Sequence, residues 1–218
     1  MINRAIKGAI FDLDGVLLDS MLIWKDLGAR YLMSIGVEPE EGLGTILFSM
    51  SMEQAAEYLV DHYSLDKTPE DVGRAITEVL KDFYYDEVKT KEGAKELLEK
   101  FSAAGIRITA ATSSPRGHIT AALERNGLLG YIEKIFTNAE VGSSKHTPEI
   151  YDAAAGFMGT ERGETYVFED SQYALETAAA AGFVAVGVFD AHGASDQESM
   201  KKTAAVYLDD LTQVEKLL

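Results

Sequence analysis

Residues 7–20 read KGAIFDLDGVLLDS, a short apolar run that ends in two aspartates and a glycine. Residues 7–11 have the length and character of a buried strand, and Asp12, Asp14 and Gly15 follow directly. Five more runs of this type occur at 106–111, 134–137, 166–169, 184–189 and 205–208. Stretches with helical spacing of apolar residues lie between them, at 92–104, 115–126, 148–158, 171–181 and 196–202. Strands that alternate with helices predict an α/β fold with a Rossmann-like, mainly parallel sheet covered on both faces.

A segment without a convincing strand interrupts this alternation after the first run. Between about residues 20 and 85, apolar residues recur at helical spacing in three stripes. The stripes are Trp24, Leu27, Tyr31 and Leu32; Ala55, Leu59 and Tyr63; and Val72, Ile76, Val79, Leu80 and Phe83. We interpret them as the packed faces of a helical cap inserted into the α/β fold. We expect a core domain of residues 1–17 and 89–218 and a cap domain of residues 18–88.

Composition narrows the class of protein. The 218 residues are 46% hydrophobic and 26% charged, enough for one core and a smaller second unit. The absence of cysteine excludes disulfides and thiolate chemistry. The formal net charge of −16 produces an average field that repels nucleic acid, and the run 9–11 is too short for a signal peptide or membrane span. We expect a cytoplasmic protein, monomeric by default, that binds neither nucleic acid nor membrane.

Polar clusters follow four of the predicted strands. Thr112, Ser113 and Ser114 follow the second strand, Lys145 lies past the third, and Glu169 and Asp170 end the fourth. Each cluster alone is ordinary, because turns and helix caps use the same residues. Ligands of open parallel sheets bind beyond the carboxyl ends of the strands, where all four clusters, the Asp12–Asp14 pair after the first strand among them, would converge. The occurrence of all four clusters together therefore predicts one site that binds an anionic substrate.

Four segments carry a resemblance to a known family. They read FDLDGVLLDS (11–20), ITAATSS (108–114), SSKHTPEIY (143–151) and VFEDSQYALETAAAAGF (167–183). Together they resemble the four motifs of the haloacid dehalogenase superfamily, and phosphoglycolate phosphatase-like and β-phosphoglucomutase-like members in particular. The third segment departs from the pattern, since His146 stands where proline commonly follows the lysine.

The resemblance implies a role for each residue of the site. Asp12 is the nucleophile that accepts the phosphoryl group, and Asp14 is the acid and base that serves the leaving group and then water. Thr112 and Lys145 contact phosphoryl oxygens. The remaining substrate-binding positions are Gly15, Ser113 and Ser114.

A metal ion is part of the same expectation. Attack by a carboxylate on a phosphate dianion requires that charge be neutralised, and Mg²⁺ favours hard oxygen ligands. The resemblance implies that Asp12, Glu169 and Asp170 supply carboxylates and that Asp14 supplies its backbone carbonyl. The function that follows is a magnesium-dependent phosphatase that hydrolyses a small phosphorylated metabolite through an aspartyl-phosphate intermediate.

Two alternatives stay open at this stage. The first is a β-phosphoglucomutase-like hexose-phosphate mutase, which resembles this chain but places a histidine where Trp24 stands and an arginine in the cap loop. Residues 47–53 contain no arginine or lysine, so a mutase would need another clamp for a distal phosphate, from Lys25, Arg30 or Arg116. The second is a regulatory or binding module that retains the fold, although none of the motif residues has been lost.

Overall fold

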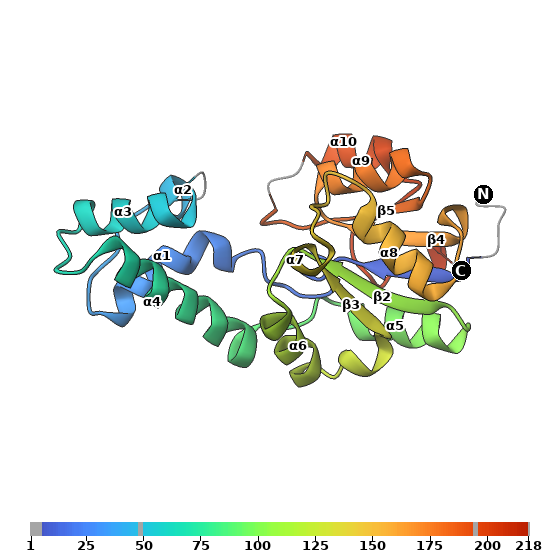
Figure 1. Cartoon of the computed structure of the whole chain (residues 1–218), viewed down its shortest axis with the longest axis horizontal. Coiled ribbons are helices and arrows are strands. Elements are labelled where there is room, and N and C mark those ends of the chain that lie inside the picture. Colours follow the sequence, from blue (N-terminus) through green and yellow to red (C-terminus); the bar gives the residue numbers. More distant parts are fainter. Residues whose placement is uncertain (1–5, 48–49, 194–195, 218) are drawn as a thin grey trace. The chain divides into compact units, whose positions relative to one another are not determined.

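The computed structural model describes residues 6–47, 50–193 and 196–217 (Figure 1). The chain folds as two compact units, an α/β unit of residues 1–19 and 89–218 and a helical unit of residues 20–88. The helical unit thus interrupts the α/β unit after its first strand. Within the described ranges, the structure has no helix of the length and apolarity needed to cross a bilayer.

The α/β unit is built on a six-stranded sheet in which neighbouring strands are parallel, in the order β3-β2-β1-β4-β5-β6. The strands are β1 (Gly8–Phe11), β2 (Arg107–Thr112), β3 (Lys134–Thr137), β4 (Thr165–Glu169), β5 (Val184–Val188) and β6 (Val206–Leu208). The predicted α/β fold is confirmed, and each predicted strand end lies within one residue of the observed one. Because β1 lies between β2 and β4, the polar residues that follow these three strands are neighbours.

Helices connect the strands of this unit. They are α5 (Ala94–Ala103), α6 (Arg116–Arg125), α7 (Asn138–Val141), α8 (Glu149–Met158), α9 (Gln172–Ala181) and α10 (Gln197–Thr203). Short 3₁₀ turns occur at Leu129–Tyr131, Arg162–Glu164 and Val214–Lys216. The four-residue α7 and the 3₁₀ turns were not predicted, because elements this short carry no periodic signal.

Alternation along the central strands assigns residues to the two faces of the sheet. Ile10 and Val167 lie in the apolar cluster that α8 covers. Their neighbours Phe11 and Phe168 point to the opposite face, where the two rings stack with centroids 4.2 Å apart. Phe101 of α5 packs against Phe11 at 6.1 Å and against Phe168 at 6.0 Å. The strands are therefore buried on both faces, which fixes the position of their carboxyl ends.

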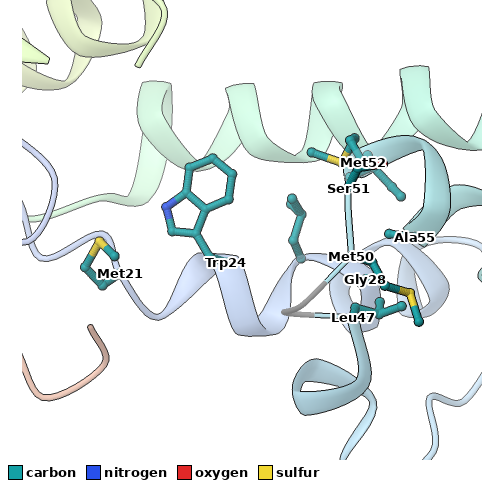
Figure 2. Close-up of a pocket in the computed structure, with 10 residues that line it drawn as sticks. Met21, Trp24, Gly28, Leu47, Met50, Ser51, Met52 and Ala55 are labelled. Carbon is teal, nitrogen blue, oxygen red and sulfur yellow. The ribbon is translucent and has the colours of Figure 1, made fainter. Parts of the chain in front are cut away.

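The helical unit contains α1 (Ile23–Ser34), α2 (Leu43–Leu47), α3 (Met52–His62), α4 (Pro69–Asp82) and a π-helical turn (Phe83–Glu87). Most residues of the predicted stripes are buried, but Trp24, Tyr63 and Val79 are only half-buried. Tyr63 directly follows α3, and its hydroxyl accepts a hydrogen bond from the backbone N–H of Glu40 at 2.9 Å. Trp24 lines a cavity (Figure 2), so its ring is not enclosed by the packing of the helices.

Candidate active site

The carboxyl end of β1 presents the Asp12–Asp14 pair on a tight turn. The backbone N–H of Asp12 donates to the carbonyl of Phe168 at 3.0 Å, which aligns this turn with the end of β4. Leu18 N–H donates to Leu13 O at 2.8 Å, and Gly15 N–H donates to Leu18 O at 2.9 Å. Gly15 has a φ of +73°, a conformation that side chains with a Cβ rarely adopt. The backbone hydrogen bonds of this turn therefore fix the positions of the two aspartates.

Lys145 lies between the ends of β1 and β4 and is 2% exposed. Its Nζ lies 2.7 Å from Asp12 Oδ1 and 2.8 Å from Glu169 Oε1. Burial alone would lower the pKa of Lys145, but the two carboxylates outweigh it and raise that pKa above its usual value. Tyr151 of α8 donates to the same Glu169 oxygen at 2.7 Å. Lys145 is thus a fixed positive charge beside the Asp12 carboxylate.

Three buried carboxylates surround this single ammonium group. Asp12, Glu169 and Asp170 each offer an oxygen, and the three oxygens lie within 4.8 Å of one another. Burial raises the pKa of Asp12 well above its usual value, opposed by Lys145 and reinforced by the neighbouring acids. Burial and the charge of Glu169 raise the pKa of Asp170 to about 7. The single positive charge of Lys145 therefore does not balance the three carboxyl groups of the cluster.

These residues fit a hard divalent cation. Among the described residues, Glu169 Oε2 is buried with no hydrogen-bond partner, although its other oxygen accepts from Lys145 and Tyr151. A buried carboxylate oxygen without a donor is costly unless a cation completes its environment. All the donors are oxygen atoms, the type that Mg²⁺ and Ca²⁺ select.

The end of β2 contributes hydroxyl groups to the same site. Ser114 Oγ donates to Asp14 Oδ2 at 2.6 Å, and the Ser114 N–H donates to Thr112 Oγ1 at 3.0 Å. Thr112 is fully buried and keeps its own hydroxyl hydrogen for donation. Ser113 is exposed, and its hydroxyl accepts from Asn138 Nδ2 at 2.8 Å. The structure therefore places the Ser114 hydroxyl on Asp14, where it orients the predicted acid and base.

Lys91, which the sequence analysis did not select, joins the turn at Gly15 to the loop after β5. Lys91 Nζ donates to Gly15 O at 2.9 Å, to Phe189 O at 2.6 Å and to Asp190 Oδ2 at 2.8 Å. The buried Asp190 accepts from two backbone N–H groups in the loop 192–193 through its other oxygen. Asp190 lies two residues past the end of β5, so the strand-end reasoning that found the other clusters also points to it. The sequence analysis missed Tyr151 as well, because a tyrosine in a helical pattern is usually a residue of the hydrophobic core.

Comparison with known proteins places these features in context. A family model described as haloacid dehalogenase-like hydrolase matches residues 9–188. The validoxylamine A 7'-phosphate phosphatase of Streptomyces hygroscopicus subsp. limoneus is 31% identical over 95% of this chain and 95% of that protein. The phosphorylated carbohydrates phosphatase of Thermotoga maritima is 26% identical over 93% of this chain and 94% of that protein.

Solved structures share the fold along the whole chain. A Thermotoga maritima protein assigned as a β-phosphoglucomutase superposes with a TM-score of 0.86 at 24% identity, covering 98% of this chain and 100% of that one. A HAD family hydrolase from Deinococcus radiodurans R1, solved with bound phosphate and sodium, gives a TM-score of 0.75 at 24% identity, covering 97% and 94%. At this level of identity the likeness establishes the fold alone.

Proposed function

Because this chain belongs to the haloacid dehalogenase-like hydrolase family, we propose that it is a magnesium-dependent phosphatase of a small phosphorylated carbohydrate, with Asp12 as nucleophile. The observation that carries the proposal is the arrangement at the end of β1. The Asp12 carboxylate lies 2.7 Å from the Lys145 ammonium group, and Asp14 follows two residues later with its carboxyl group held by Ser114. The substrate class is supported by the names of the two phosphatases similar to this chain.

In the first step an Asp12 carboxylate oxygen attacks the phosphorus atom. A bond from phosphorus to Asp12 forms while the bond from phosphorus to the sugar oxygen breaks. Protonated Asp14 gives its proton to the departing oxygen, so the sugar leaves as an alcohol. The Lys145 ammonium group and the Thr112 hydroxyl stabilise negative charge on the phosphoryl oxygens.

In the second step Asp14, now a carboxylate, removes a proton from a water molecule. The water oxygen attacks phosphorus, the bond to Asp12 breaks, and inorganic phosphate leaves. Asp14 is then protonated again, and Asp12 is again a free carboxylate. The 2.6 Å hydrogen bond from Ser114 holds Asp14 for both transfers.

Mg²⁺ is the cation that we assign to the carboxylate cluster. Asp12 and Asp170 would hold it, together with Glu169 through the oxygen that lacks a donor, and the Asp14 carbonyl is the further ligand implied by the family. When bound, the ion would neutralise negative charge on the phosphoryl group and on the carboxylates.

The structure also bears on the mutase alternative, which needs a cation for a second phosphate. Arg30 is paired with Glu87 at 2.6 Å. Arg116 is paired with Glu140 at 2.5 Å and donates to Ile135 O at 2.8 Å. Both arginines are therefore already engaged by carboxylates, which supports water as the acceptor. Conversion of β-glucose 1-phosphate to glucose 6-phosphate with little free phosphate would contradict this assignment.

The proposal is tested by removing the nucleophile and the metal separately. We expect Asp12→Asn to abolish release of phosphate from p-nitrophenyl phosphate and from phosphorylated sugars while its melting temperature stays near that of the wild type. The matched control is Asp19→Asn, the same change at an exposed position of the same motif. Chelation should abolish activity and added Mg²⁺ should restore it. Normal turnover by a folded Asp12→Asn variant would falsify the covalent mechanism.

A further inference from the structure

Tyr151 of α8 places a hydroxyl group beside the carboxylate cluster from within the core of the α/β unit. Its side chain has no exposed surface and lies in the apolar cluster that α8 covers, where its ring meets the Phe183 ring with centroids 6.0 Å apart. The hydroxyl donates to Glu169 Oε1 at 2.7 Å. A backbone carbonyl would satisfy a buried tyrosine equally well, as Leu217 O does for Tyr166 at 2.8 Å. Neither step of the proposed reaction uses the Tyr151 hydroxyl, so its bond to a carboxylate needs another explanation.

Within the described part of the chain, the donors to the Glu169 carboxylate meet at one of its two oxygens. The Tyr151 hydroxyl lies 2.7 Å from Oε1, and Lys145 Nζ lies 2.8 Å from the same atom. A carboxylate oxygen has two lone-pair directions, so these two donors together occupy it. The other oxygen, Oε2, is buried without a hydrogen-bond partner among the described residues. Glu169 therefore has one oxygen open to a cation, and the donors on the other restrain rotation of the carboxylate.

The number of oxygens that a carboxylate offers favours one hard cation over another. Mg²⁺ requires near-ideal octahedral geometry with metal–oxygen distances of about 2.0–2.1 Å. Ca²⁺ takes roughly six to eight oxygens at about 2.3–2.6 Å, and it accepts both oxygens of one carboxylate. A carboxylate that is held with one oxygen free therefore suits Mg²⁺, whereas a carboxylate that can turn and offer both oxygens suits Ca²⁺.

We propose, on the basis of the Mg²⁺ assignment in the function above, that Tyr151 is a positioning residue that favours Mg²⁺ over Ca²⁺ by keeping one oxygen of Glu169 away from the ion. Lys145 does not secure this alone, because its ammonium group also lies 2.7 Å from Asp12 Oδ1 and contacts a phosphoryl oxygen in the proposed reaction. The Tyr151 hydroxyl has one hydrogen to donate and directs it to Glu169. Because the core holds the ring, this donor stays on Glu169 throughout the reaction.

The first test measures metal binding without substrate. Melting temperatures at increasing concentrations of MgCl₂ or CaCl₂ give a dissociation constant for each ion. Tyr151→Phe removes the hydroxyl and keeps the ring, and we expect it to lower the ratio of the Ca²⁺ constant to the Mg²⁺ constant by about 10-fold. The matched control is Tyr166→Phe, which removes a buried hydroxyl of β4 that donates to a backbone carbonyl, and it should leave the ratio unchanged. An unchanged ratio in Tyr151→Phe, or an equal change in both variants, would overturn the inference.

The second test asks whether Tyr151 acts through Glu169. Glu169→Gln removes the charge of the carboxylate and one of its two metal-binding oxygens while nearly preserving its shape. When Tyr151→Phe is added to Glu169→Gln, the ratio of the two dissociation constants should change by less than about 2-fold, because residues that act as a unit are not additive. A change of the same size in the wild-type and Glu169→Gln backgrounds would show that the tyrosine acts through core packing, and it would overturn the positioning role.

The third test separates the metal from the chemistry with p-nitrophenyl phosphate as substrate. In Tyr151→Phe, the Mg²⁺ concentration for half-maximal activity should rise by about 10-fold, while kcat at saturating Mg²⁺ stays within about 3-fold of the wild type. The Ca²⁺ concentration that halves the rate at a fixed Mg²⁺ concentration should fall by about 10-fold. A loss of kcat with an unchanged metal requirement would overturn the inference. If the wild-type protein releases no phosphate from any substrate, the proposed function is refuted instead, and the ratio measured without substrate still decides the role of Tyr151.

Discussion

At Asp170, burial and the charge of Glu169 oppose ionisation, and they raise the pKa of this carboxyl group from 3.8 to about 7. An unfolded chain ionises it near pH 4, whereas the metal-free folded protein retains the proton up to about pH 7. Between these values the folded state binds more protons, so the free energy of unfolding falls as pH rises. The loss is complete above the folded pKa and amounts to at most about 4 kcal/mol.

We therefore expect the melting temperature of the metal-free protein to fall between pH 5 and pH 8. Asp170→Asn should remove part of this fall, because asparagine carries no charge at either pH. Mg²⁺ should restore stability to the wild-type protein at pH 8 and much less to the variant. Thermal unfolding at several pH values gives the measurement, with Asp19→Asn as an exposed control. A fall of the same size in Asp170→Asn would assign the pH dependence to other groups.

Lys91 holds the turn at Gly15 and the loop at Asp190 through one ammonium group. Lys91→Met leaves the buried Asp190 without its cation, and we expect the free energy of unfolding to fall by about 2–4 kcal/mol. We also expect the Mg²⁺ concentration for half-maximal activity to rise, because Gly15 adjoins Asp14 and the loop at Gly193 approaches Asp170.

Denaturant unfolding and Mg²⁺ titrations of activity measure the two effects. Lys89→Met is the matched control, since it is the same substitution at an exposed position two residues away. Adding Asp190→Asn to Lys91→Met should recover part of the lost stability, because the unpaired charge is then gone. If Lys89→Met lowers the free energy of unfolding as much as Lys91→Met does, the loss comes from the charge of the segment and not from the hydrogen bonds of Lys91.

Among the elements, α5 begins at a glycine that contacts the C-terminal part of the chain. Gly93 has a φ of +80°, and a Cβ there would lie 2.6 Å from the backbone nitrogen of Thr212. Gly105, which follows the same helix, has a φ of +74° and nothing within 4 Å of its Cβ position. Alanine should cost about 1 kcal/mol at Gly105 through backbone strain alone.

At Gly93 the same substitution must also displace the segment at 211–212. We expect Gly93→Ala to lower the free energy of unfolding by about 3 kcal/mol or more, by the overpacking that a fixed backbone cannot relieve. Chemical denaturation of the two variants side by side gives the comparison. Equal losses would show that the C-terminal segment moves aside at little cost.

The elements that the sequence predicts well are those with a long periodic pattern and two buried faces. The strand at Gly8–Phe11 is apolar throughout, as expected of a strand that helices cover on both sides. The apolar run and the polar Asp12 that follows it therefore predict the same strand end. The four residues of Asn138–Val141 and the π-helical turn at Phe83–Glu87 are set by their surroundings, which no local pattern encodes. Trp24 fits a helical stripe yet lines a cavity, because spacing predicts a face and not what covers it.

The site residues were predictable to the extent that topology brings strand ends together. Thr112 ends β2, and Asp12 and Asp170 directly follow β1 and β4 of the same sheet, so the parallel order alone makes them neighbours. Lys145 was selected because it lies past the third predicted strand and within a family motif, and its two ion pairs show what a lysine does there. The contribution of Lys91 depends on a contact across 99 positions of sequence, and no spacing rule reveals such a pair.

At the scale of the whole molecule, the formal charge of −16 opposes the approach of a phosphate dianion. Salt screens this repulsion over about 10 Å at 0.1 M ionic strength. At saturating Mg²⁺, we expect kcat/KM to rise by about 2- to 5-fold between 20 and 200 mM KCl while kcat stays constant. Initial rates at several ionic strengths provide the test. A fall in kcat/KM with added salt would mean that local positive charge near Lys145 dominates the approach.

Any movement of the helical unit must begin beyond the point where its two linkers are joined. Asp19 N–H donates to Lys89 O and Lys91 N–H donates to Leu17 O, both at 2.9 Å, and Leu18 pairs with Thr90 between them. These bonds tie both linkers to the α/β unit, so we predict that the hinge lies at residues 20–22 and 86–88. Hydrogen exchange with and without vanadate as a phosphate analogue should change there, while the amides of Asp19 and Lys91 stay protected. Vanadate-dependent exchange at Asp19 and Lys91 would show that the joined linkers themselves open, which would place the hinge inside the α/β unit.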